Sequence, residues 1–192
     1  MDRYWLLTSA FYGNRLPGDP RGFVSRVRDV RAGDAPGTRH EHDIPGTPVD
    51  ADMPGLHRSA QGQLKGPPIR VNPEQAGALV PQFRETAGLR GWLLLAVAVV
   101  EDHVHLVVGV RGDPHPRKVL GDFKAYGSRP LTRGWGTPPS GTWWTYGGSK
   151  RKLPNTRAVR SAIIYLRDQP GALLVWLAPQ ALAMLAEGGL PD

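Results

Sequence analysis

Two histidines stand one residue apart near the middle of the chain, in the run EDHVHLVVGV from Glu101 to Val110. The chain has 192 residues and only six histidines, so two of them in one apolar run need an explanation. In a β-strand, alternate side chains share a face about 6.6 Å apart along the axis, so His103 and His105 can converge on one ion. Buried imidazoles need polar partners or an ion, and the alternative to a metal site is a hydrogen-bonded pair at a sheet surface.

A tyrosine and a glutamine near the end of the chain could complete such a site. Tyr165 and Gln169 are four residues apart in a segment with helical periodicity, which predicts that they share one helix face, one turn apart. A tyrosine phenolate can attack a phosphodiester. His103, His105 and Gln169 would offer two nitrogens and one oxygen to Mg²⁺ or Mn²⁺, with open positions left for a phosphate.

Four other tyrosines compete for the role of nucleophile. Tyr126, in the sequence FKAYGSR, is predicted on a helix with basic neighbours and is the main alternative to Tyr165. Tyr4 and Tyr12 belong to the predicted first strand and are expected in the core or at its rim. Tyr146 lies in an aromatic segment and could stack a nucleobase.

The elements that must position these residues follow from periodicity and from turn residues. The first half is predicted to contain a strand from Arg3 to Tyr12, a Gly/Pro-rich loop at about 31–68, a helix from Pro73 to Gly88, and a hairpin of Trp92–Val100 and His103–Val110. A helix then begins at Arg117, and Pro130 should end it near Arg129. The last predicted elements are a short strand at Thr142–Tyr146, a helix from Asn155 or Thr156 to Pro170, and a C-terminal helix at about 178–187.

This order predicts a single domain over residues 1–192 with the Gly/Pro-rich loop as an insertion. Strand, helix, strand, strand, helix, strand, helix is the split pattern of a ferredoxin-like α/β (α+β) sandwich. We expect a central antiparallel sheet with helices on one face and the C-terminal helix as an addition.

The charge of the chain favours a polyanionic partner. The formal net charge is +7, and the sequence pI is about 10.1. Basic residues expected to contact phosphates follow the histidines and the aromatic segment: Lys118, Lys124, Arg129, Lys150, Arg151 and Lys152. Three tryptophans could stack unpaired bases, although core packing is the more common fate of any one of them: Trp135, Trp143 and Trp144.

Composition also excludes several classes of site. The chain has no cysteine, so disulfides, thiolate metal sites and cysteine nucleophiles are excluded. The longest strongly apolar run, Trp92 to Val100, is about half of the ~20 residues that a membrane-spanning helix needs. We therefore expect no membrane span, and we interpret the amino terminus as a strand rather than a secretion signal.

The string GWLLLAVAVVEDHVHLVVGV resembles the HUH endonucleases, and in particular the REP-associated tyrosine transposases and related small insertion-sequence transposases that act on single-stranded DNA. FYGNRLPGDPRGFV is similar to the turn after the first strand in one branch of that family, and IYLRDQP is similar to its catalytic helix. The resemblance covers most of the chain except about residues 31–68. The REP-associated branch commonly has asparagine where this chain has Gln169, so the choice of branch stays open.

The resemblance implies a metal-dependent enzyme that nicks and rejoins single-stranded or hairpin DNA through a covalent 5′-phosphotyrosine. Tyr165 would be the nucleophile, and His103, His105 and Gln169 would hold Mg²⁺ or Mn²⁺. Asp102 would orient a histidine or only cap the turn. No nucleotide cofactor is expected, the enzyme would work in the cytoplasm on nucleoid DNA, and it could be a monomer or a homodimer.

Two alternatives remain. One is a domesticated, catalytically silent protein that binds DNA hairpins. The other is a phosphoesterase that acts on nucleotides.

Overall fold

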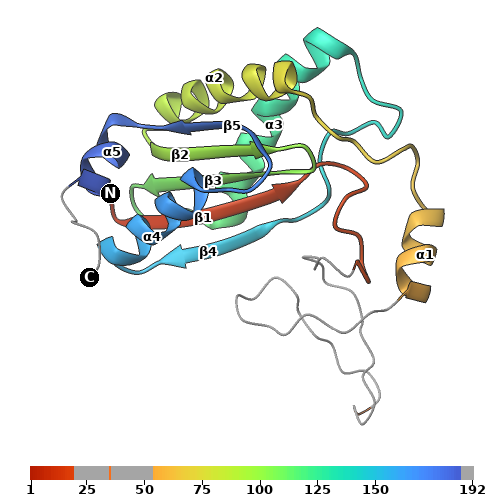
Figure 1. Ribbon diagram of the computed structural model, residues 1–192, viewed down its shortest axis with the longest axis horizontal. Coiled ribbons are helices and arrows are strands. Elements are labelled where there is room, and N and C mark those ends of the chain that lie inside the picture. Colours follow the sequence, from red (N-terminus) through yellow and green to blue (C-terminus); the bar gives the residue numbers. More distant parts are fainter. Residues whose placement is uncertain (20–34, 36–53, 187–192) are drawn as a thin grey trace.

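A five-stranded antiparallel sheet forms the centre of the protein in the computed structural model, which describes residues 1–19, 35 and 54–186 (Figure 1). The strands are β1 (Arg3–Ala10), β2 (Leu93–Val100), β3 (His103–Val110), β4 (Ser149–Leu153) and β5 (Ala172–Leu177), in the spatial order β4-β1-β3-β2-β5. The α+β class and the antiparallel sheet are therefore confirmed. Strand β3 is the middle strand, so both of its edges are paired.

Helices cover both faces of the sheet. Helices α2 (Pro73–Leu89) and α3 (Pro116–Trp135) pack on the face that carries Val104 and Leu106. Helices α4 (Thr156–Arg167) and α5 (Pro179–Ala186) pack on the face that carries Val107, and Figure 1 shows α4 in front of the sheet with α3 behind it. The expectation of helices on one face only was wrong, because β3 is buried along its whole length and the apolar stripe of α4 (Val159, Ala162, Ile163 and Leu166) covers the second face.

The helix starts follow local rules of capping. Asn72 and Gln75 form a reciprocal capping box at the start of α2, and the Asn155 side chain accepts a hydrogen bond from the Ala158 N–H (2.9 Å) at the start of α4. Helix α3 continues through Pro130 to Trp135, although the sequence predicted an end near Arg129. The turn beyond Pro130 is anchored because Leu131 is fully buried in the core.

The strands at the two edges differ most from expectation. Residues 142–146 do not form a strand, and they pair with the sheet only through the bridge between Phe11 and Trp144, whose rings stack 4.7 Å apart. The fourth strand is the basic segment Ser149–Leu153, which pairs with β1. Strand β5 was not predicted, because the sequence after the helix end at Pro170 was not assigned to an element before the C-terminal helix.

The segment predicted as a loop at 31–68 is partly helical. Helix α1 (Pro54–Gly62) lies within it, and most of the remainder lies outside the described residues. Within the described ranges no helix is long and apolar enough to cross a membrane.

Candidate active site

The two histidines of β3 face each other beneath helix α4. The Nε2 atoms of His103 and His105 are 2.9 Å apart, and the rings meet edge to face at 84°. The residues are only 8% and 5% exposed, because their strand is central and α4 packs on this face. Two nitrogens at this distance need a proton or a cation between them, since two lone pairs would repel.

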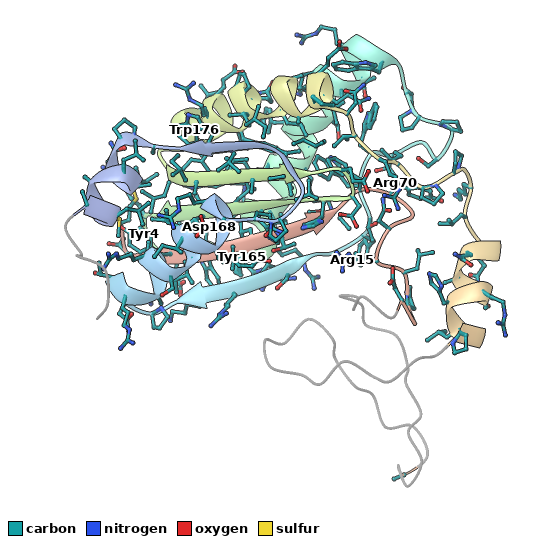
Figure 2. All side chains as sticks on the ribbon, in the orientation of Figure 1. Tyr4, Arg15, Arg70, Tyr165, Asp168 and Trp176 are labelled. Carbon is teal, nitrogen blue, oxygen red and sulfur yellow. The ribbon has the colours of Figure 1, made fainter. Side chains whose placement is uncertain are left out.

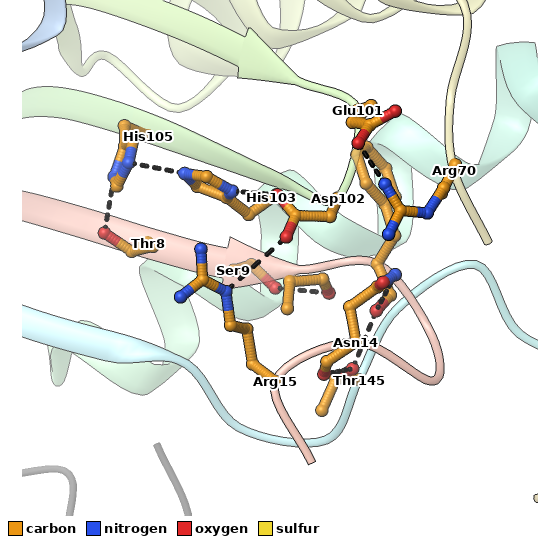
Figure 3. A network of polar contacts seen from close by, with 12 residues as sticks. Thr8, Ser9, Asn14, Arg15, Arg70, Glu101, Asp102, His103, His105 and Thr145 are labelled. Carbon is orange, nitrogen blue, oxygen red and sulfur yellow. Dashed lines mark hydrogen bonds and ion pairs between the residues drawn. The ribbon is translucent and has the colours of Figure 1, made fainter. Parts of the chain in front are cut away.

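Each imidazole has a partner on its other nitrogen (Figure 3). His103 Nδ1 makes a very short contact with Oδ1 of Asp102 in the β2–β3 turn, and the Arg15 Nε lies 3.5 Å from Asp102 Oδ2. His105 Nδ1 lies 2.8 Å from the hydroxyl of Thr8, its neighbour on β1. Both rings are therefore fixed in orientation, with their Nε2 atoms turned toward the same point.

Burial keeps His105 uncharged. The pKa of His105 is lowered to about 3, mainly by desolvation and further by the neighbouring His103 and Arg15, while Asp102 acts in the opposite direction. At neutral pH the ring of His105 is therefore neutral and can act as a ligand or as a hydrogen-bond partner.

Helix α4 places Tyr165 over this pair within the same chain. The Tyr165 hydroxyl lies 3.5 Å from His105 Nε2, and the two rings meet edge to face with centroids 5.3 Å apart. The tyrosine is 48% exposed, so its phenol has imidazoles on one side and solvent on the other. Figure 2 shows Tyr165 projecting from α4 over the sheet.

Gln169 does not share the helix of Tyr165. Helix α4 ends at Arg167, Asp168 is its C-cap, and Gln169 lies beyond it. The expectation of one shared helix face was wrong because Pro170 disfavours helical backbone at the residue before it. Among the described residues the Gln169 Oε1 is buried without a hydrogen-bond partner, so it is a carbonyl oxygen in need of a donor or a cation.

The histidine pair fits a divalent cation. Two ligands at about 2.05 Å and at right angles on an octahedral ion are separated by about 2.9 Å. The Nε2 atoms have that separation, and their Nδ1 atoms have the hydroxyl and carboxylate partners typical of metal-binding histidines. In the described part of the chain no cluster of three His, Cys, Asp or Glu side chains could complete a site, so further ligands would come from the Gln169 amide, water or a substrate.

An open groove of about 710 Å³ extends from the site between β4 and α4. Thr8, His105 and Tyr165 lie along it. Basic and polar side chains make up much of the remaining wall: Ser149, Arg151, Lys152, Asn155, Arg157 and Ser161. A phosphate backbone could follow this groove to the phenol.

The pleat of β4 divides the predicted basic triplet. Arg151 pairs with Leu6, whose side chain packs on the α4 face, so Arg151 points toward the groove. Lys150 pairs with Leu7, which is buried on the opposite face, and the Lys150 ammonium donates to the Gly148 carbonyl. Lys152 shares the parity of Lys150 but still borders the groove at the sheet edge.

The predicted phosphate contacts on α3 lie on the opposite face from the histidines. Lys118 forms an ion pair with Asp122 (3.2 Å), and the Lys124 ammonium donates to the carbonyl of Thr145 (2.6 Å) and to that of Gly147. Arg129 lies 4.2 Å from the centre of the Tyr126 ring. The structure therefore does not bring these three cations to the groove, and it places the alternative nucleophile Tyr126 on the wrong face.

Two of the three predicted stacking tryptophans are core residues. Trp143 and Trp144 are 6% and 5% exposed, and Trp144 donates its indole N–H to the Lys124 carbonyl (2.8 Å). Trp135 is partly exposed, and Tyr146 is the most exposed aromatic side chain in the described ranges, at 88%.

Sequence analysis missed several residues that surround the site. Thr8 lies between Leu7 and Ser9 in β1, and only the pairing of β1 with β3 places it opposite His105. Arg15 lies in a turn, with a backbone φ of 53° that is uncommon for a residue other than glycine. Arg157, in the first turn of α4, carries no pattern that would assign it to a groove.

Comparisons with known proteins include a distant similarity in shape. No family model matches the sequence, and no curated protein matches it. A solved structure described as a REP-associated tyrosine transposase bound to a REP hairpin aligns with 88% of this chain and 67% of its own, with 12% identity and a TM-score of 0.43. No activity carries over to this chain from a similarity of that extent.

Proposed function

We propose that the protein is a metal-dependent transposase-type endonuclease and strand transferase. It would nick and rejoin single-stranded or hairpin DNA through a covalent link between Tyr165 and a 5′-phosphate. The observation that carries this proposal is the Tyr165 hydroxyl, 3.5 Å from an Nε2 atom of a buried histidine pair, at the end of a basic groove.

The nucleophile is accessible. Because the phenol is about half exposed, a phosphate can approach it from the solvent side, and the proton lost on attack can pass to water. The reaction balances: the tyrosine oxygen bonds to phosphorus, the bond to the 3′-oxygen breaks, and that oxygen leaves as a 3′-hydroxyl after taking up a proton. Rejoining is the reverse reaction with another 3′-hydroxyl, so no external energy source is needed.

The proposed metal ligands are His103, His105 and Gln169. Two Nε2 atoms at 2.9 Å and a buried amide oxygen without a partner match the donor types that Mn²⁺ and Mg²⁺ accept. A bound cation would polarise the scissile phosphate and stabilise the leaving oxygen. Asp102 and Thr8 hold the imidazoles in place for it.

The strand of DNA would lie along the groove between β4 and α4. Arg151 and Arg157 are cations on its wall that would contact phosphates, and Lys152 borders it at the edge. The net charge of +7 adds a long-range attraction to any nucleic acid.

A labelled hairpin tests the chemistry and its polarity together. The substrate is a pool of DNA hairpins with randomised single-stranded flanks, carrying one fluorophore at the 5′ end and a different one at the 3′ end, incubated with Mn²⁺. We expect a denaturation-resistant protein adduct that contains the 3′ fluorophore only, since Tyr165 would hold the 5′-phosphate of the downstream fragment.

Matched variants separate nucleophile from fold. Tyr165→Phe should abolish the adduct, whereas Tyr126→Phe should leave it unchanged. His103→Ala and His105→Ala should abolish cleavage and preserve salt-sensitive binding. An adduct formed by Tyr165→Phe, or one labelled at the 5′ end, contradicts the proposal. Hairpin binding by the wild type without cleavage under any divalent ion would instead favour a catalytically silent DNA-binding protein.

A further inference from the structure

We propose that Thr8 is a positioning residue that lets His105 change its tautomer when a cation binds, while Asp102 and Arg15 keep His103 in one tautomer. This inference rests on the proposed metal site and assigns a role to groups around it. It follows from three contacts: Thr8 to His105 Nδ1, His105 Nε2 to His103 Nε2, and His103 Nδ1 to Asp102.

The hydrogen bond between His103 Nδ1 and the Asp102 carboxylate can have only one direction. An ionised carboxylate only accepts hydrogen bonds, so His103 must carry its proton on Nδ1 and present a bare Nε2. Arg15 Nε lies 3.5 Å from the second oxygen of Asp102, so this carboxylate contacts a cation on one side and the His103 Nδ1 atom on the other. The left-handed backbone of Arg15, the one such residue besides glycines in the described ranges, shows that the turn accepts a strained conformation at this residue.

The hydrogen bond between the Thr8 hydroxyl and His105 Nδ1 can reverse its direction. When both rings are neutral and no cation is present, one proton assignment satisfies all three contacts. His105 then donates from Nε2 to His103, and the Thr8 hydroxyl donates to His105 Nδ1. A threonine hydroxyl can also accept, so the same 2.8 Å contact serves a ring protonated on Nδ1.

Binding of a cation requires that reversal. Both Nε2 atoms must be bare to ligate one ion, so the His105 proton leaves Nε2 for solvent and Nδ1 takes up a proton, with no net change in ring charge. Thr8 then accepts from Nδ1–H, and its own proton turns toward the groove that it lines. A side chain without a hydroxyl would leave the Nδ1–H buried and unpaired.

Nitrogen NMR of the histidine side chains tests this directly. We expect the metal-free protein to show His105 protonated on Nε2 and the Mg²⁺-saturated protein to show it protonated on Nδ1, with His103 protonated on Nδ1 in both. Thr8→Val should weaken Mn²⁺ and Mg²⁺ binding by about 10- to 100-fold, as loss of such a partner typically does. Thr8→Ser keeps the hydroxyl and should bind within about threefold of wild type on the same scale.

Ser9→Ala is the matched control, because Ser9 is the next residue of β1 and its hydroxyl lies on the other face, 3.5 Å from the Ala10 carbonyl oxygen. A His105 tautomer that stays the same on Mg²⁺ binding overturns this inference and leaves the proposed function intact. Wild-type metal affinity in Thr8→Val also overturns this inference. If Thr8→Val does not fold, the spectra of the wild-type protein with and without Mg²⁺ test the tautomer change. A tautomer change without DNA cleavage overturns only the proposed function, and failure to bind either metal overturns both.

Discussion

Replacing Gly148 by alanine should destabilise the protein and disturb the groove, whereas the same change at Gly147 should do little. Both glycines lie in the turn that leads into β4, and both have positive φ, 81° at Gly147 and 135° at Gly148. A Cβ at Gly147 would meet no atom within 4 Å. A Cβ at Gly148 would lie 2.5 Å from the Thr8 carbonyl oxygen and 2.6 Å from a methyl group of Leu120.

The two costs can be worked out separately. At position 147 alanine costs about 1–2 kcal/mol for left-handed backbone, and the lower entropy of the unfolded chain returns about 0.4–1 kcal/mol. At position 148 the backbone strain is about 1–3 kcal/mol, and the steric overlap adds about 1–3 kcal/mol because a strand backbone cannot rotate away. We therefore expect a loss of about 1 kcal/mol for Gly147→Ala and about 2–5 kcal/mol for Gly148→Ala.

Urea denaturation of both variants measures this difference, and a chain of this size should lose about 2–4 °C of Tm for each kcal/mol. Because Thr8 pairs with Ser149, the residue after Gly148, the clash should also shift Arg151 and weaken hairpin binding in Gly148→Ala alone. Equal free energies of unfolding for the two variants would refute the steric argument. Reduced stability with unchanged hairpin affinity would refute the link between the turn and the groove.

Two further predictions concern the charges around β4. Arg151→Gln should reduce the magnitude of the slope of log affinity against log salt by about 0.7, which corresponds to the loss of one phosphate contact to a single strand. Lys150→Gln should reduce it less, because Lys150 faces α3. Equal slopes for the two variants would contradict the proposed path of the DNA. Burial and the nearby Lys150 lower the pKa of Lys124 to about 8 from 10.5, so the folded state binds fewer protons between those values and stability should rise across that pH window. From pH 8 to 10.5, the free energy of unfolding of the wild type should rise relative to that of Lys124→Met. That rise should be smaller when Lys150→Met is added to both proteins. A difference in unfolding free energy between wild type and Lys124→Met that stays constant over this pH range would contradict the lowered pKa of Lys124.

The parts of the fold that local sequence determines were predicted well. The hairpin of β2 and β3 is two apolar runs joined by two residues, and its bounds differ from the prediction only at Trp92. Helix α4 begins at Thr156 with Asn155 as its cap, which is one of the two caps that the sequence predicted. These features depend on residues close in sequence, so one sequence is enough to show them.

The parts that depend on distant pairing were not predictable in the same way. The aromatic run 142–146 has strong strand propensity, but its tryptophans are used as core anchors, and the basic segment after it forms the strand. Strand β4 is held by its pairing with β1, which lies more than a hundred residues earlier. Propensity is outweighed here by tertiary contacts that the sequence does not display.

The same distinction applies to the candidate site. The spacing of His103 and His105 predicts a shared face because both residues belong to one strand. Thr8 and Arg15 come from a different part of the chain, and only the β1–β3 register and the following turn bring them to the imidazoles. The helical pattern predicted Gln169 on the same helix as Tyr165, but the helix ends before Pro170. The Gln169 Oε1 is nevertheless buried without a partner among the described residues, so the predicted role of Gln169 as a ligand stays a prediction.

The connections of α4 explain why Tyr165 meets the histidines of its own chain. Only Pro154 and Asn155 separate the end of β4 from the start of α4, and four residues separate α4 from β5. Strand β4 pairs with β1, and β5 pairs with β2, so both ends of the helix are tied to the sheet that carries His103 and His105. An exchange of α4 between two subunits would have to break one of these edge pairings or stretch a two-residue link, which spans at most about 7 Å. The arrangement of tyrosine over imidazoles is thus a consequence of strand order, and one chain is sufficient to build it.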